Sequence, residues 1–276
     1  MNIPTHKLDP LIITVAPNGA RKTKKDHIGL PISPDELAKD AYACIKAGAS
    51  MIHLHVRADD ETHILDVARY REATSAIQNL CGEDIIIQAT TEAVGQYSAP
   101  EQMKLVRELR PQSASLAIGE LVPEGGEAAA KEFFQELVLQ NILPHYIVYS
   151  AGELRRFLTL VNDGIIPEDN IFLLFVLGRY SQGQTSHPSD LLPFLAVLED
   201  RFPWSVCAFG PLEHASASAA VALGGHVRVG FENNIFLKNG EIADGNANLV
   251  SQVTSVASAV GRPTAAASEI YSILQK

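Results

Sequence analysis

The hexapeptide IHLHVR at residues 52–57 is the stretch from which the fold of this chain of 276 residues can be inferred. Apolar and β-branched residues surround its two histidines, which predicts a buried strand, and a helical pattern over residues 34–47 that stops at Gly48 precedes it. Residues i and i+2 of a strand point to the same face, so His53 and His55 should lie side by side. Two imidazoles near the C-terminal end of a strand predict either a metal site or a pair with only structural contacts.

Strand and helix patterns alternate in the same way along the rest of the chain. Eight strands are predicted, each as a short apolar run, over residues 11–16, 51–56, 84–89, 113–118, 145–149, 171–176, 204–209 and 225–230. Eight helices follow them, over residues 34–47, 66–80, 100–109, 127–140, 152–163, 189–200, 213–223 and 245–260. Such alternation implies a parallel sheet, and eight strand–helix units predict a single α/β domain, residues 1–276, with the TIM barrel fold. An open doubly wound sheet is the alternative, although no Gly-rich dinucleotide fingerprint follows the first strand.

The composition limits the classes of protein to which the chain can belong. Its formal net charge is −10 and 46% of its residues are hydrophobic, so we expect a large core and no general binding to nucleic acid or anionic membranes. Three cysteines far apart in sequence predict free thiols in a reducing compartment. Because the chain has neither an apolar signal segment nor a run of about 20 apolar residues, we expect a soluble, cytoplasmic protein.

Polar side chains gather where the predicted strands end, which is where the active site of a TIM barrel lies. The candidates at these ends are His53, His55, Thr90, Thr91, Glu92, Ser115, Glu120, Glu213, His214, Arg228, Glu232 and Asn233. Because the last strand closes the barrel beside the first, Glu232 should approach the histidine pair. Two imidazoles and one carboxylate with an open position are a common catalytic zinc set, in which the metal acts as a Lewis acid or activates water. The alternative for Glu232 is an exposed surface carboxylate.

Two motifs, HLHVR at 53–57 and GGHVRVGFENN at 224–234, resemble the β-keto acid cleavage enzyme family. The similarity also covers residues 11–20, 30–49, 85–95, 175–178 and 246–253, so it runs nearly from end to end. The resemblance implies a TIM barrel in which His53, His55 and Glu232 hold Zn²⁺. The implied reaction is a reversible condensation of a β-keto acid with acetyl-CoA, which gives acetoacetate and a new acyl-CoA. A homo-oligomer, commonly a tetramer, is implied as well.

Further residues match functional positions of the family. The resemblance implies that Thr90 and Ser115 contact the substrate carboxylate, although both hydroxyls could equally bind neighbouring strands. It also implies that Arg228 holds a general base, which is an Asp in typical members. This chain has Asn233 at that position, and an amide accepts no proton at neutral pH. Glu92 could replace this Asp as the general base, or it could be a fourth metal ligand. The alternative is that Glu92 is a solvated carboxylate on a loop.

Two arginines are further candidates. Arg21 stands where family members with amine substrates carry an acidic residue, and its charge predicts a substrate with a neutral or anionic tail. Arg179, on the loop after the sixth predicted strand, is either a contact for a CoA phosphate or a solvated side chain. The remaining histidines that we considered are interpreted as structural or surface residues: His63, His145, His187 and His226.

Two other functions remain open on the sequence. Loss of the Asp base also suits zinc-dependent carbon–carbon cleavage without CoA, such as retro-Claisen hydrolysis or aldol cleavage. A non-catalytic protein that binds a keto acid is the second alternative. The expected partners are a small β-keto acid and acetyl-CoA, with neither nucleic acid nor a membrane.

Overall fold

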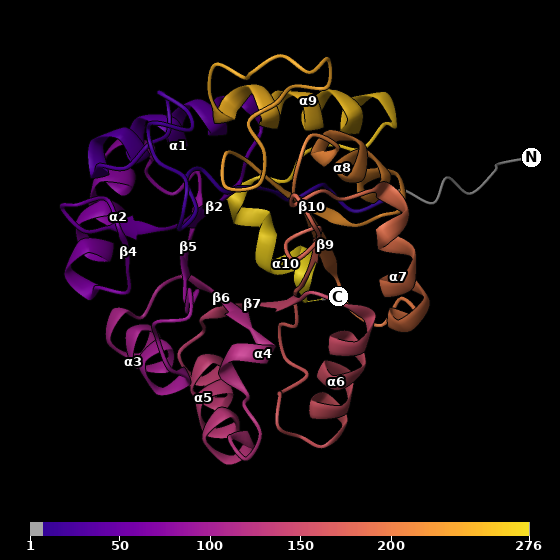
Figure 1. Ribbon diagram of the computed structural model, residues 1–276. Coiled ribbons are helices and arrows are strands. Elements are labelled where there is room, and N and C mark those ends of the chain that lie inside the picture. Colours follow the sequence, from indigo (N-terminus) through magenta and orange to yellow (C-terminus); the bar gives the residue numbers. More distant parts are fainter. Residues whose placement is uncertain (1–7, 276) are drawn as a thin grey trace, which may run out of the picture.

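The predicted strands pair in parallel and close into a barrel, around which the helices form an outer ring (Figure 1). The structure is a computed structural model that describes residues 8–275. In order around the barrel, the strands are β1 (Ile13–Val15), β10 (His226–Val229), β9 (Trp204–Ala208), β8 (Leu173–Leu177), β7 (Leu143–Val148), β6 (Ser113–Ala117), β5 (Ile86–Thr90) and β2 (Met51–Leu54). This closed order confirms the TIM barrel, and the alternative of an open doubly wound sheet is wrong.

Most of the helices surround the barrel, and the last one lies across one of its ends (Figure 1). The helices are α1 (Pro34–Ala47), α2 (Val67–Cys81), α3 (Ala99–Leu109), α4 (Ile118–Leu121), α5 (Glu127–Leu139), α6 (Ala151–Asn162), α7 (Leu192–Leu198), α8 (Glu213–Ala222), α9 (Asn246–Ala259) and α10 (Ile270–Leu274). None of the helices within residues 8–275 has the length and apolar character that a membrane span requires.

Strand β1 closes the barrel between the last strand and the second. Thr14 lies opposite Arg228 of β10, and Val15 lies opposite Ile52 of β2. Strand β1 thus separates β2, which carries His53, from β10, and the HLHVR and GGHVRVGFENN motifs lie on the two sides of β1 at one end of the barrel.

Helix α1 begins and ends where the sequence predicts. Ser33 accepts a hydrogen bond from the backbone N–H of Glu36, and the Glu36 side chain binds back to Ser33 as a capping box. Pro34 occupies the first turn, where its missing N–H has no intrahelical partner to lose. The helix stops at Gly48, whose φ of 112° is a left-handed conformation that favours glycine.

The strand predicted over residues 51–56 is interrupted at His55. Strand β2 ends at Leu54, and β3 (Val56–Arg57) pairs antiparallel with β4 (His63–Ile64) in a separate two-stranded sheet. Segments of two residues are too short to have a recognisable period, so the sequence did not predict this hairpin. It brings His63 into contact with His55.

Two helical segments also differ from those predicted. The helix expected over residues 189–200 is a 3-10 turn, η1 (Pro188–Leu191), followed by α7, after which Glu199 and Asp200 have left-handed backbones. Helix α4 was not predicted, because a single turn is too short to reveal a helical period.

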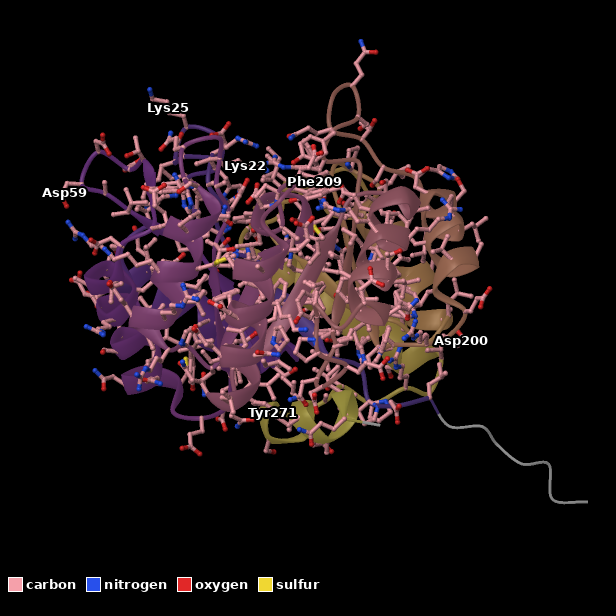
Figure 2. All side chains as sticks on the ribbon, turned by 90° about the horizontal axis from the view of Figure 1, so that it is seen from below. Lys22, Lys25, Asp59, Asp200, Phe209 and Tyr271 are labelled. Carbon is pink, nitrogen blue, oxygen red and sulfur yellow. The ribbon has the colours of Figure 1, made fainter. Side chains whose placement is uncertain are left out.

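One end of the barrel is filled with apolar side chains. Helix α10, preceded by the 3-10 turn η2 (Ala267–Glu269), covers this end. The buried cluster there consists of Ile12, Met51, Ile86, Leu143, Phe172, Ala265, Ala267, Ile270, Ile273 and Leu274. In Figure 2, Tyr271 of α10 lies at one end of the molecule, and Lys22 and Phe209 lie at the other. The C-terminal ends of the strands are therefore the end at which a site can form.

Gly230 follows β10 and has no room for a side chain. Its φ is 145°, and an added Cβ would lie 2.3 Å from the carbonyl oxygen of Ala16. We expect Gly230→Ala to lower the free energy of unfolding by about 2–4 kcal/mol, because the backbone of β1 would have to move away. Gly119→Ala in α4, where the added Cβ meets nothing within 4 Å, should change it little. Chemical denaturation compares the two, and equal stability of both variants would contradict the prediction.

Candidate active site and metal centre

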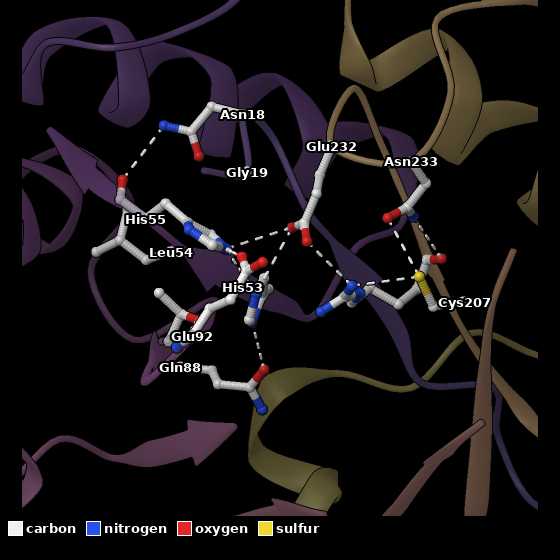
Figure 3. Close-up of polar contacts among 12 residues, drawn as sticks. Asn18, Gly19, His53, Leu54, His55, Gln88, Glu92, Cys207, Glu232 and Asn233 are labelled. Carbon is white, nitrogen blue, oxygen red and sulfur yellow. Dashed lines mark hydrogen bonds and ion pairs between the residues drawn. The ribbon is translucent and has the colours of Figure 1, made fainter. Parts of the chain in front are cut away.

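Three predicted metal ligands converge at the C-terminal end of the barrel (Figure 3). The Nε2 atoms of His53 and His55 lie 3.0 Å apart. The Oε2 atom of Glu232 lies 3.6 Å from the first and 3.5 Å from the second. Glu232 is therefore not an exposed surface carboxylate, and the structure brings together the three residues that the sequence singled out.

The backbone around the barrel closure positions these ligands. The N–H of Glu232 donates to the carbonyl oxygen of Ala16 at the end of β1. Lys22 donates from Nζ to the carbonyl oxygen of Glu232 at 2.7 Å, and Asn18 donates to that of His55 at 3.2 Å. The loop after β1 thus fixes both the histidine strand and the turn that carries the carboxylate.

Hydrogen bonds to the other ring nitrogens assign the tautomer of each imidazole. Nδ1 of His53 lies 2.8 Å from Oε1 of Gln88, which can only accept, so Nδ1 carries the proton. His63 donates from Nε2 to the carbonyl oxygen of Glu92, which leaves its Nδ1 to accept from Nδ1 of His55 at 3.4 Å. Both Nε2 atoms therefore present a lone pair toward Glu232.

The charge distribution fits a bound cation. Burial by itself would raise the pKa of Glu232, but Arg228, with Nη2 at 3.2 Å from Oε1, and the two imidazoles hold that pKa well below its usual range. Burial also lowers the pKa of His53, which keeps the imidazole neutral. Two facing lone pairs and a buried carboxylate oxygen without a hydrogen bond remain. This donor set fits a divalent metal ion such as zinc.

A small cavity lies beside the triad. Its lining contains both polar and apolar or aromatic residues, namely His53, Thr90, Thr91, Glu92, Ser115, Ala117, Glu120, Ile147, Tyr149, Val176, Arg179, Phe209, Arg228 and Glu232. Three buried polar atoms of these residues have no hydrogen-bond partner: Ser115 Oγ, Arg228 Nε and Glu232 Oε2. Unpaired buried polar atoms are costly, so they indicate a ligand that pairs with them.

Glu92 lies inside this cavity and not in solvent. Its Oε1 accepts from Nη2 of Arg179 at 3.0 Å, and its Oε2 lies 4.0 Å from Nε2 of His55. Burial raises the pKa of Glu92, and the negative charge of Glu232 adds to that shift. Arg179 also stacks over the ring of Phe209, so its guanidinium is held within the cavity by two contacts.

Asn233 faces away from the cavity. Its Oδ1 accepts from the thiol of Cys207 at 3.2 Å, and its Nδ2 donates to Glu213 and to the carbonyl oxygen of Arg228. Glu213 is fully buried and also accepts from the backbone N–H of Gly230. Asn233 therefore stabilises the turn that carries Glu232, and it does not line the cavity.

Several of these residues were missed or undervalued at the sequence level. Gln88 is a polar residue inside the apolar run DIIIQA, and this pattern could have identified it as a functional residue. No sequence pattern identified His63, because its contact with His55 depends on the hairpin that was not predicted. Arg21 does not line the cavity but a neighbouring one, and its charge still acts on Glu92 and Glu120.

A parallel barrel with two neutral imidazoles and an ionised carboxylate at the C-terminal ends of its strands defines a barrel enzyme with a preformed cation site. The chain matches the family model of the beta-keto acid cleavage enzyme over residues 10–275, and it belongs to that family.

Curated relatives and solved structures agree with this assignment. The chain is 33% identical over 273 residues to 3-keto-5-aminohexanoate cleavage enzyme of Fusobacterium nucleatum, covering 97% of this chain and 98% of that protein. It is 29% identical to 3-oxoadipate:acetyl-CoA acetyltransferase of Cupriavidus necator, covering 96% and 94% of the two chains. The structure of ObcA with a C4-CoA adduct and oxalate superimposes with a TM-score of 0.72 at 16% identity, covering 89% of this chain and 67% of that one, which supports the fold.

Loss of any ligand of the triad should abolish tight metal binding. We expect the wild type to hold one zinc ion per chain, and His53→Ala and Glu232→Gln to lower the affinity by a factor of about 100 or more, because each removes a direct donor. His187→Ala, at an exposed histidine, is the control. Elemental analysis after dialysis measures the zinc content of each protein. Full zinc occupancy in Glu232→Gln would contradict the assignment of Glu232 as a ligand.

The buried Glu213 carboxyl should make stability depend on pH. Burial raises the pKa of Glu213 to about 8, so folding favours the protonated form, and the stabilisation is lost as the pH rises from about 5 through about 8. In metal-free protein, Glu213→Gln should flatten this fall in the free energy of unfolding by an amount on the order of 2–4 kcal/mol. Burial also raises the pKa of Asp40 to about 7, so the stability of Glu213→Gln should still depend on pH to a smaller extent.

The control for this comparison is Glu124→Gln, at an exposed loop position. Denaturation at a series of pH values gives the slopes. Identical slopes in the wild type and in Glu213→Gln would exclude Glu213 as the titrating group.

Proposed function

We propose that the protein is a zinc-dependent β-keto acid cleavage enzyme, which converts a β-keto acid and acetyl-CoA into acetoacetate and a new acyl-CoA. The observation that carries this proposal is that the ligand triad shares one cavity with the unpaired polar atoms of Ser115 and Arg228. Membership of the beta-keto acid cleavage enzyme family supports it. So do relatives whose names specify acetyl-CoA as the acceptor.

His53, His55 and Glu232 would hold the zinc ion, which supplies a Lewis acid for the keto oxygen of the substrate. Arg228 keeps Glu232 ionised and fixes its orientation through the ion pair at 3.2 Å. Ser115 donates its unpaired hydroxyl to the substrate carboxylate, and Thr90, on the next strand, lies within the same wall. The substrate methylene group between the two carbonyl carbons is thereby held against the base.

Glu92 acts as the general base. It accepts a proton from that methylene group, whose carbon then attacks the thioester carbonyl of acetyl-CoA and releases the CoA thiolate. The thiolate adds to the original keto carbon, the carbon–carbon bond breaks, and the acetoacetate carbanion recovers the proton from Glu92. A raised pKa suits a carboxylate that must accept and return a proton, and Arg179 orients it. Asn233 cannot fill this role, because it is an amide and faces Cys207 and Glu213.

Arg21 favours a substrate with a neutral or anionic tail. Burial raises the pKa of both Glu92 and Glu120, and the positive charge of Arg21 acts against that shift on both carboxylates. A cation brought to the same rim would meet this charge, whereas a carboxylate would be attracted. We therefore expect 3-oxoadipate to be a better substrate than 3-keto-5-aminohexanoate, and efficient turnover of the latter would contradict this preference.

The remaining parts of the proposal are zinc as the metal, a single domain over residues 1–276, a homo-oligomer of tetrameric size and a cytoplasmic location. Elemental analysis tests the identity of the metal, and limited proteolysis tests the single domain. Light scattering tests the oligomeric state, and cell fractionation tests the location.

The experiment that tests the function is a screen of β-keto acids with zinc-loaded protein, run with and without acetyl-CoA. The proposal expects acetoacetate only when acetyl-CoA is present, and none from Glu232→Gln. Product formation without acetyl-CoA would point to a lyase or hydrolase instead. Binding of keto acids without any turnover would point to a non-catalytic binding protein.

Replacing Glu92 separates its possible roles. Glu92→Gln removes proton acceptance but keeps the shape, so we expect kcat to fall by a factor of about 10²–10⁴ with the zinc content unchanged. Glu120→Gln, which changes a lining carboxylate that is neither the proposed base nor a proposed metal ligand, should lower kcat by less than about tenfold. Unchanged kcat in Glu92→Gln would exclude it as the base, and loss of zinc would identify it as a fourth ligand.

A further inference from the structure

A second, wider cavity of about 710 Å³ opens beside the metal site. Four basic residues and two acidic ones contribute to its lining, which consists of Ala20, Arg21, Thr23, Lys24, Lys25, Arg57, Asp60, Glu61, Thr62, His63, Val94 and Gln96. On a chain with a formal net charge of −10, such a local excess of positive charge is unusual.

The basic residues of this cavity differ in what they already contact. Arg57 is committed to the backbone, since its guanidinium donates to the carbonyl oxygens of Gly19, Lys22 and Glu61. Lys24 pairs with Glu36, but the two side chains are 36% and 40% exposed, so this surface ion pair is weak and a phosphate can replace it. Neither Arg21 nor Lys25 forms an ion pair with any residue of the described range 8–275.

The acidic residues of the wall are partly engaged. Asp60 accepts from the backbone N–H and the hydroxyl of Thr62, which closes the turn between β3 and β4. Glu61 is at the tip of the same hairpin, with a left-handed backbone. Arg21, Lys24 and Lys25 belong to the loop after β1, whereas Asp60 and Glu61 belong to the turn between β3 and β4, so the basic and acidic residues of the lining come from two different segments.

The two cavities share a wall. His63 lines the wide cavity, and its Nδ1 lies 3.4 Å from Nδ1 of the metal ligand His55. Its Nε2 donates to the carbonyl oxygen of Glu92, which lines the smaller cavity. Figure 2 places Lys25 and Lys22 at the same end of the molecule as Phe209, another residue of the smaller cavity.

The size of the smaller cavity limits what it can hold. It is much smaller than the wide cavity, so the nucleotide part of a CoA thioester must lie outside it. Arg179 is unavailable for phosphates, because it is paired with Glu92. The wide cavity has both the charge and the room that several phosphate groups need.

We propose that the wide cavity binds the phosphate-bearing nucleotide end of the CoA co-substrate, with Arg21, Lys24 and Lys25 as its cationic contacts. Thr23, on the same loop, offers a hydroxyl to the phosphate oxygens. This inference rests on the proposed use of acetyl-CoA. The loop after β1 would then have two functions. Lys22 supports the turn that carries Glu232, and the residues next to Lys22 hold the co-substrate.

The test compares Lys24→Met/Lys25→Met with the control Lys39→Met/Lys46→Met, which removes the same charge from exposed positions on helix α1. Calorimetry with the zinc-loaded proteins should give a Kd for CoA and for adenosine 3′,5′-bisphosphate that is about tenfold or more weaker in the first variant only. The KM for acetyl-CoA should rise similarly, while kcat and the KM for the keto acid stay unchanged. The KM for acetyl-pantetheine, which lacks the nucleotide, should be the same in all three proteins.

Binding and turnover separate the outcomes. If no keto acid is turned over, the proposed function fails, yet a loss of bisphosphate binding confined to Lys24→Met/Lys25→Met still supports the site. Equal Kd values in both double variants would overturn the site, even with full activity. A wild type that binds neither CoA nor the bisphosphate would overturn it as well.

Discussion

The backbone contact between the end of β1 and the turn after β10 is the constraint on which the site depends. Ala16 donates its N–H to Val229 and accepts from the N–H of Glu232, and Gly230 is the residue that allows this approach. The contact closes the barrel and at the same time delivers a carboxylate from the last strand to the two imidazoles of the second. Fold closure and assembly of the candidate metal site are thus one event, so a chain that fails to close cannot bind the metal.

Around that contact, charges are arranged so that each buried group has a compensating partner. Arg228 pairs with Glu232, and Arg179 pairs with Glu92. Glu213 receives hydrogen bonds from the turn itself. Buried ions without partners are costly, so these pairs explain how three carboxylates can lie near one another in a mostly apolar barrel. The atoms left unpaired in the cavity are Glu232 Oε2, which a metal ion can bind, and the donors Arg228 Nε and Ser115 Oγ, which the carbonyl and carboxylate oxygens of a substrate can accept from.

The fold and the pairing of the two histidines could be predicted from the sequence because both follow from periodicity, and the approach of Glu232 followed from closure of the barrel. Eight apolar runs separated by helices define the barrel, and the i, i+2 spacing of His53 and His55 puts them on one face. What could not be predicted depends on contacts between segments without a period. The β3–β4 hairpin, which brings His63 to His55, consists of two-residue strands. Likewise, the inward position of Glu92 depends on its pairing with Arg179, and the outward turn of Asn233 depends on Glu213 and Cys207.

The most direct test of the proposed reaction follows the acetyl group. Zinc-loaded protein is given an unlabelled β-keto acid and acetyl-CoA that carries carbon-13 in both acetyl carbons, and the products are identified by mass spectrometry and carbon NMR. We expect the label in the methyl and keto carbons of acetoacetate, together with an unlabelled acyl-CoA derived from the keto acid. Unlabelled acetoacetate, or a free carboxylic acid in place of the acyl-CoA, would contradict transfer to CoA at this site.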